Sequence, residues 1–227
     1  DLIERIHRVE GLERIRLGSL EPRIITREFA EKLAGLPEFC PHFHLSLQSG
    51  CDATLKRMNR HYTTEDYLRR CGILREIFDH PAITTDVIAG FPGETEEEFE
   101  ETRRFLETVR FYEMHVFKYS KRQGTRAAVM EDQVPEQVKA RRSDVLLELE
   151  KTMSREYRER FAGSRVSVLF EEAAEIGGKW YMMGHTPQYV KAALPLEDGM
   201  NREEFGGRIM ELFASGLLND EMLKVEF

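Results

Sequence analysis

Polar and apolar residues alternate strictly from residue 42 to residue 48. The polar ones are His42, His44, Ser46 and Gln48. Successive side chains of a β-strand point to opposite faces, so these four share one face. In a (β/α) barrel, helices cover the outside of the strands, and a polar face would then point into a lumen that holds a ligand. A strand at a sheet edge, with its polar face in solvent, explains the pattern equally well.

Two imidazoles on one face of a strand can also bind a transition metal. His42 and His44 are two residues apart and would present their ring nitrogens on the same side. No third ligand is apparent in the sequence, so we predict no metal site.

A second candidate is the run from Asp86 to Thr95, which reads as a buried strand, a tight turn and the start of a helix. Gly90 and Gly93 let the backbone approach a ligand closely at the carboxyl end of a strand, where parallel α/β proteins place their sites. The run lacks the lysine and the glycine spacing of a Walker A loop, and Glu94 would repel an anion. A plain turn between strand and helix is the alternative.

A third candidate is the basic stretch that contains Lys118, Lys121, Arg122 and Arg126, with Tyr119 among them. Positive charge beside an aromatic ring could meet a nucleic-acid backbone or a ligand carboxylate, although solvated surface is the simpler explanation. The whole chain has 33 Lys and Arg against 41 Asp and Glu, a net charge of -8. General attraction to a polyanion is therefore excluded, and nucleic acid would have to contact local patches.

Short β-like runs alternate with amphipathic helical runs over residues 13–126, which predicts parallel strands with crossover helices. We expect strands at residues 14–19, 42–48, 84–90 and 114–120, and helices at residues 27–33, 65–78 and 96–109. Their N-terminal signals are Thr26, the pair Thr63 and Asp66, and the pair Thr95 and Glu98.

The pattern then changes twice. A long charged helix over residues 135–162 is expected to connect two domains, at 1–134 and 163–227. From Gly163 onward apolar residues alternate with period two, and Gly177-Gly178 offers a hairpin turn. The fold class is therefore α/β, a partial (β/α) barrel followed by a small antiparallel β-barrel domain. That last domain has six Lys or Arg against eleven Asp or Glu, which argues against phosphate binding over its whole surface.

The three cysteines, Cys40, Cys51 and Cys71, are widely spaced and form no C-x-x-C pair. We expect reduced thiols rather than disulfides or a structural zinc site. No apolar run approaches about eighteen residues and the first residues are charged, so a protein of the cytoplasm, with no membrane partner, is expected.

Three motifs carry a resemblance to a known family. Residues 43–51 read FHLSLQSGC and are followed by LKRMNR at 55–60, TDVIAGFPGET stands at 85–95, and FKYSKRQGT at 117–125. In this order they resemble the methylthiotransferase family of radical S-adenosylmethionine (SAM) enzymes, over nearly the whole chain. The segment from Gly163 resembles the TRAM domain that closes these proteins. The SLQSGC version is similar to the branch that acts on N6-threonylcarbamoyladenosine in tRNA.

The resemblance implies the later strands of a radical SAM barrel and the insertion of a methylthio group at C2 of the modified adenosine. It implies SAM and two 4Fe-4S clusters as cofactors, and tRNA as partner. The residues that it places around the cofactor are Ser19, Glu21, Arg23, His44, Ser46, Gln48, Ser49, Asp86, Gly90, Phe91, Pro92, Tyr119, Ser120 and Arg122.

The sequence departs from the family in its cysteines. The C-x3-C-x2-C motif of the radical cluster and the three cysteines of the second cluster are missing, so we expect an inactive part of a longer enzyme. A strand at residues 14–19 without its neighbour would promote self-association. The alternatives are the isopentenyladenosine branch, a non-catalytic RNA-binding module, and a radical enzyme or methyltransferase that acts on a small molecule.

Overall fold

The computed structural model describes residues 2–197 and 202–227, which form two compact units. The sheet unit consists of Leu17–Pro37 and Phe43–Met153. The barrel unit consists of the described parts of Asp1–Arg16, Glu38–His42 and Ser154–Phe227. Because the units divide the helix α6 (Glu136–Glu159), the domain boundaries at 134/135 and 162/163 stay predictions.

The sheet has four strands in the order β1-β2-β3-β4. They are β1 (Ser19–Leu20), β2 (His42–Leu45), β3 (Ala82–Ala89) and β4 (Glu113–Lys118). The pairs β1/β2 and β3/β4 are parallel, and an isolated parallel bridge joins Gln48 to Val87. Parallel neighbours need crossover connections, and the alternation of strands and helices predicted from the sequence is confirmed.

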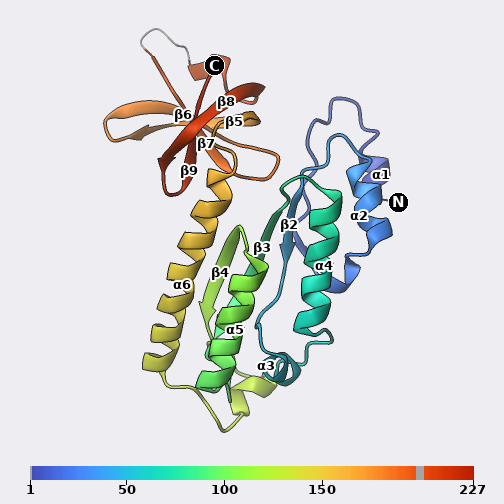
Figure 1. Cartoon of the computed structure of the whole chain (residues 1–227), viewed down its shortest axis with the longest axis vertical. Helices are drawn as coiled ribbons and strands as arrows, with labels where there is room; N and C mark the ends of the chain where they lie inside the picture. The colour runs from blue at the N-terminus through green and yellow to red at the C-terminus, as the bar shows by residue number, and fades with distance from the viewer. Residues whose placement is uncertain (1, 198–201) are drawn as a thin grey trace. The chain divides into compact units, whose positions relative to one another are not determined.

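Helices occupy the connections. They are α2 (Arg27–Ala34), α3 (Asp52–Arg57), α4 (Thr64–Ile77) and α5 (Glu96–Val109), with a short 3-10 turn η1 (Pro22–Ile24) after β1. Figure 1 shows α4 and α5 lying over one face of the sheet. The buried Tyr67 hydroxyl of α4 donates a hydrogen bond to the Leu45 carbonyl at 2.8 Å, which ties this helix to β2.

Local signals set the helix starts. Thr63 and Asp66 form a capping box at α4, and Thr95 and Glu98 form one at α5. The Thr26 side chain accepts a hydrogen bond from the Phe29 N–H at the start of α2. The three predicted N-terminal signals are confirmed, because a cap depends only on residues within one turn.

The strand expected at residues 14–19 is wrong in its bounds. Ile15 makes one isolated bridge, to Phe39, and β1 begins only at Ser19. Arg14 belongs to the barrel unit, where its side chain donates hydrogen bonds to the carbonyls of His185 at 2.7 Å and Ser167 at 3.1 Å. The remaining edge strand has two residues, and self-association through it stays a prediction.

The barrel unit is a closed barrel with the strand order β5-β6-β7-β9-β8. Its strands are β5 (Arg165–Ile176), β6 (Lys179–His185), β7 (Lys191–Pro195), β8 (Ile209–Asn219) and β9 (Met222–Glu226). Neighbouring strands are antiparallel as predicted, except that β7 and β9 are parallel. Gly177 and Gly178 have φ angles of 59° and 78° and form the predicted hairpin turn between β5 and β6. The unit also contains the short helices α1 (Leu2–Ile6) and η3 (Arg202–Glu204).

Among the described residues no helix is both long and apolar enough to span a membrane. The three cysteines are buried and free.

Candidate functional site

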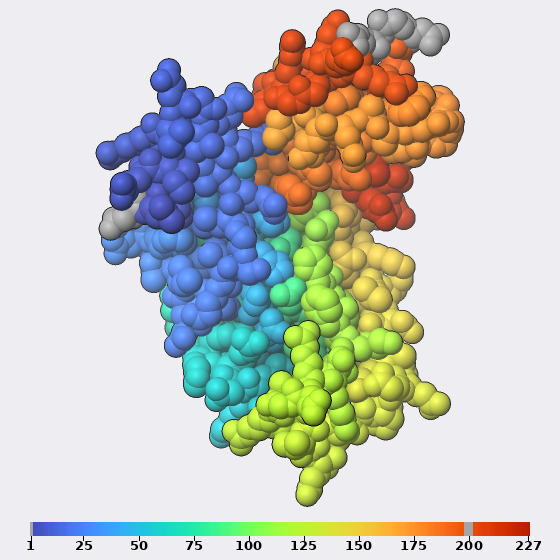
Figure 2. Space-filling view, turned by 180° about the vertical axis from the view of Figure 1, so that it is seen from behind, coloured from blue at the N-terminus to red at the C-terminus, as the bar shows by residue number. Residues whose placement is uncertain are grey.

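One face of the sheet is open, on the side opposite to α4 and α5. On β3 and β4 the side chains of Thr85, Val87 and Met114 are buried, whereas His115 and Phe117, on the other face of β4, are exposed. Phe117 keeps 52% of its surface accessible. Figure 2 views the molecule from this side, with the yellow-green chain after β4 at the surface. A sheet face with exposed polar and aromatic groups is available to a ligand.

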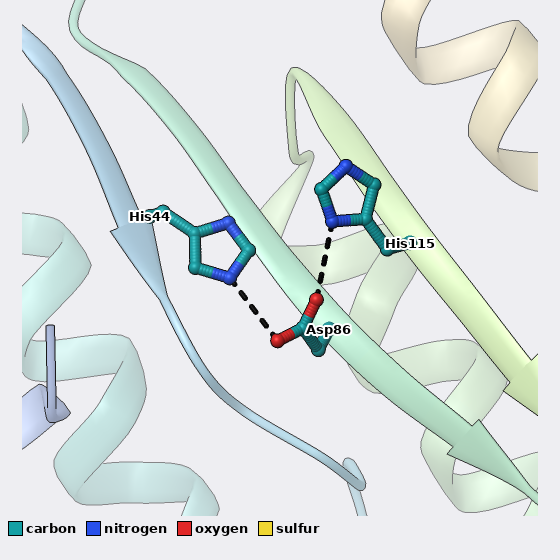
Figure 3. Close-up of side chains that lie close together, drawn as sticks. All are labelled: His44, Asp86 and His115. Carbon is teal, nitrogen blue, oxygen red and sulfur yellow. Dashed lines mark hydrogen bonds and ion pairs between the residues drawn. The ribbon is translucent and has the colours of Figure 1, made fainter. Parts of the chain in front are cut away.

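Three polar side chains meet on this open face (Figure 3). The Asp86 carboxylate lies between two imidazoles, with Oδ2 at 3.2 Å from His44 Nε2 and Oδ1 at 3.1 Å from His115 Nδ1. His44 Nδ1 lies 3.0 Å from the hydroxyl of Thr84. We call His44, Asp86 and His115 the His-Asp-His cluster.

Strand pairing fixes the cluster. Asp86 and His115 are direct partners in the register of β3 with β4, and His44 lies on β2, the next strand of the sheet. The exposed fractions of the side chains rise from 11% for His44 through 25% for Asp86 to 60% for His115. The cluster is therefore held by rigid backbone on one side and open to solvent on the other.

The turn after β3 is anchored by a buried ion pair. The Glu94 carboxylate accepts a hydrogen bond from the Gly90 N–H at 2.8 Å and from Arg142 of α6 at 2.7 Å. Burial raises the pKa of Glu94, while the Gly90 N–H and Arg142 act in the opposite direction. Glu94 therefore shapes the turn from inside and does not face a ligand.

Gly90 satisfies two separate demands. Its φ angle is +75°, a conformation that side chains disfavour, and a Cβ atom there would lie 2.4 Å from Lys139 Cγ. The next residue, Phe91, packs edge-on against Tyr119 at 5.4 Å between ring centroids. The Tyr119 N–H donates to the Ala89 carbonyl at 2.9 Å. The ends of β3 and β4 thus form one continuous rim.

The other residues predicted around the cofactor fall into two groups. Gln48, Ser49 and Pro92 are buried: Gln48 has φ of 73°, and the Ser49 hydroxyl lies 3.1 Å from that of Thr102 on α5. Ser46 is half-buried, and its carbonyl accepts a hydrogen bond from the Tyr62 hydroxyl at 2.9 Å.

The second group is exposed. Ser19 stands opposite His44 in the register of β1 with β2, and Glu21 and Arg23 form an exposed ion pair at 2.6 Å. Ser120 and Arg122 lie on the surface of the loop after β4. The structure thus brings His44 to Asp86 and Phe91 to Tyr119, and their roles toward a cofactor stay predictions.

Comparisons with known proteins agree with the motifs. The model of the Radical SAM superfamily matches residues 1–106. Threonylcarbamoyladenosine tRNA methylthiotransferase MtaB of Bacillus subtilis is 44% identical over 185 residues, which is 81% of this chain and 41% of the relative. The tRNA-2-methylthio-N(6)-dimethylallyladenosine synthase of Acetivibrio thermocellus is 42% identical over 179 residues, which is 79% of this chain and 37% of the relative.

The chain is therefore similar to the radical SAM tRNA methylthiotransferases over most of its own length. It spans about two fifths of the length of these relatives. The solved structure of coproporphyrinogen III oxidase from Escherichia coli, a radical SAM enzyme, has a TM-score of 0.51 and 22% identity, and the match covers 66% of this chain and 34% of that one. This likeness shows the fold alone, and it confirms the predicted partial radical SAM fold.

Iron–sulfur clusters of such a family need thiolates, and the described cysteines do not fit that need. None of them belongs to a group of three candidate ligands among the described residues. Burial raises the pKa of Cys40 and Cys51, and it raises the pKa of Cys71 to about 12. These thiols stay protonated, and a cluster ligand must be deprotonated.

The fit to SAM is better. The partly exposed Asp86 carboxylate can accept hydrogen bonds from ribose hydroxyls, and the exposed Phe117 ring offers an apolar surface on the same face of the sheet.

Sequence reasoning missed His115, Thr84 and Arg142. The pair His42 and His44 is not one site, because the His42 ring contacts Tyr189 in the barrel unit at 5.5 Å between ring centroids. Alternation along β4 would have placed His115 on the polar face, but only the register shows that it meets Asp86.

Proposed function

We propose that this chain is part of a tRNA methylthiotransferase that inserts a methylthio group at C2 of N6-threonylcarbamoyladenosine. The observation that supports threonylcarbamoyladenosine as the substrate is the share of this chain that each group of relatives matches. Relatives named for threonylcarbamoyladenosine match 81% and 84% of this chain, against 79% and 75% for two named for dimethylallyladenosine. The dimethylallyladenosine relatives reach 46% identity, so their substrate is the second candidate.

In this proposal the open face of the sheet holds SAM and the target adenosine. Bound SAM would supply the radical chemistry and the methyl group. The chain's own residues bind and orient these two molecules. Asp86 and His44 contribute polar contacts, and the rim of Gly90, Phe91 and Tyr119 keeps water away from the bound nucleoside. The protein that contains this chain acts on tRNA in the cytoplasm, and ligands for two 4Fe-4S clusters come from its other parts.

The basic loop after β4 is the proposed tRNA contact. Lys121, Arg122 and Arg126 are exposed in a loop without acidic side chains from residue 118 to residue 130. A local patch of this kind contacts phosphates even though the whole chain is acidic.

The test is deletion of the gene that encodes the full protein, followed by mass spectrometry of nucleosides from total tRNA. We expect the methylthio form of threonylcarbamoyladenosine to disappear and its unmodified precursor to accumulate, with restoration by the wild-type gene. If the methylthio form of the isopentenyl nucleoside is lost instead, the substrate is isopentenyladenosine, and the proposed methylthio insertion stands.

A tRNA pool unchanged in both nucleosides would overturn the proposal. Complementation with Asp86→Ala tests the open face separately, because a protein that accumulates normally but fails to restore the nucleoside places the defect in the site. Glu107→Ala, on the exposed side of α5, is the matched control and should restore the modification fully.

A further inference from the structure

The His-Asp-His cluster has the composition and spacing of a metal site. We propose that His44, Asp86 and His115 bind a divalent transition-metal ion of the Zn²⁺ class on the open face of the sheet. The ligand atoms of the three residues all lie within 4.8 Å of one another. No other such group of three His, Cys, Asp or Glu residues occurs in the part of the chain that the structure describes.

Each imidazole nitrogen lies at the distance of a neighbouring ligand atom from one of the two carboxylate oxygens. Zn–N and Zn–O bonds of about 2.0 to 2.2 Å at tetrahedral angles place neighbouring ligand atoms about 3.3 Å apart. His44 Nε2 lies 3.2 Å from Oδ2 of Asp86, and His115 Nδ1 lies 3.1 Å from the other oxygen, Oδ1. The ligand atoms of the two imidazoles lie within 4.8 Å of each other.

The surroundings of His44 fit the role of a ligand. When Nε2 binds a metal, the remaining proton lies on Nδ1, and here that atom is 3.0 Å from the Thr84 hydroxyl. Metal-binding histidines usually donate their second N–H to such an acceptor, which fixes the tautomer and the ring orientation. Thr84 is therefore a positioning residue of the site.

The chemistry of the donors selects the class of ion. Two imidazoles and one carboxylate suit Zn²⁺ and its neighbours, whereas Mg²⁺ and Ca²⁺ prefer oxygen ligands. Without the ion the imidazole N–H groups donate to the carboxylate. The ion would take the place of those protons, and each imidazole would then carry its proton on the other ring nitrogen. With three protein ligands and an exposed side, water or a substrate atom completes the shell.

The test is a titration of the untagged, metal-stripped chain with Co²⁺ as a spectroscopic substitute for Zn²⁺. We expect d–d absorption that saturates at one equivalent and is displaced by Zn²⁺. His115→Ala, whose side chain is 60% exposed and whose loss should leave the fold intact, and Asp86→Asn should both abolish the absorption. Thr84→Val should retain it with affinity about tenfold weaker.

His61→Ala is the matched control, because His61 is exposed in the same unit and lies outside the cluster. It should bind Co²⁺ like the wild-type chain. No absorption from the wild-type chain, or absorption that survives both His115→Ala and Asp86→Asn, would overturn the proposal. Urea unfolding of each variant separates loss of the site from loss of the fold. The readout needs no methylthiotransferase activity, so failure of the metal site is distinguishable from failure of the proposed function.

Discussion

Glu94 and Arg142 form an ion pair that is almost fully removed from solvent. Their side chains are 1% and 4% exposed, and Arg142 Nη1 lies 2.7 Å from Glu94 Oε2. The same arginine donates to the Glu94 carbonyl at 3.0 Å. The pair fixes α6 to the turn that follows β3, 48 residues earlier in the chain.

Arg142→Ala should lower the free energy of unfolding by about 3 to 5 kcal/mol, because it leaves the Glu94 carboxylate buried without its cation. The neighbouring Arg141 is the matched control: it pairs with Glu96, but both side chains are about half exposed. Arg141→Ala should cost about 0 to 1 kcal/mol. Urea denaturation measures both, and equal costs would contradict the structural role of the buried pair.

The pair Arg57 and Glu98 predicts a dependence of stability on pH. The hydrogen bond from Arg57 lowers the pKa of Glu98 below its ordinary value of 4.5. A carboxyl whose pKa is lower in the folded state contributes stability above 4.5 that is lost as pH falls through the folded value. Glu98→Gln should therefore be about 1 kcal/mol less stable at pH 7, and the difference should shrink as pH falls below 4.5.

Urea midpoints from pH 7 to pH 3 measure this difference. Arg57→Gln removes the same interaction from the other side, and its difference from the wild-type chain should shrink over the same range. A difference that stays constant with pH would show that the carboxylate gains nothing from Arg57.

Gly90→Ala should destabilise the protein for two reasons, whereas only one of them applies to Gly124→Ala. Both glycines have positive φ, +75° and +82°, but no atom lies within 4 Å of the Cβ position at Gly124. The conformation costs about 1 to 2 kcal/mol in each variant, and the collision with Lys139 adds about 1 to 3 kcal/mol at residue 90. Adding Lys139→Ala to both variants should reduce the difference in unfolding free energy between Gly90→Ala and Gly124→Ala. If that difference does not change, the collision with Lys139 is not its cause.

The three thiols should be unreactive in the folded chain. Burial raises the pKa of each, to about 12 for Cys71, and only the thiolate attacks a disulfide reagent. Ellman's reagent at pH 8 should titrate three thiols in urea and react only slowly without it. A rapid reaction of Cys71 under native conditions would show that its helix opens readily.

Local features of this chain were predictable and contacts between distant segments were not. The helix expected at residues 96–109 was found as Glu96–Val109, because its cap and its hydrophobic spacing lie within the helix itself. The strand expected at residues 14–19 was wrong in its bounds: β1 begins at Ser19, and Arg14 bonds to carbonyls more than 150 residues away. The same limit applies to His115 and to Arg142, whose partners are set by strand register and by helix docking.

The hydrogen bonds of Arg14 can form only late in the synthesis of the chain. Its acceptor His185 lies 171 residues further along the chain, and ribosomes add roughly 5 to 20 residues each second. Arg14 is therefore synthesised about 10 to 30 s before His185. The sheet strands emerge earlier and can pair meanwhile, so the nascent chain presents residues 2–16 to the cellular environment until the barrel is made. This interval is when a chaperone or a protease would meet residues 2–16.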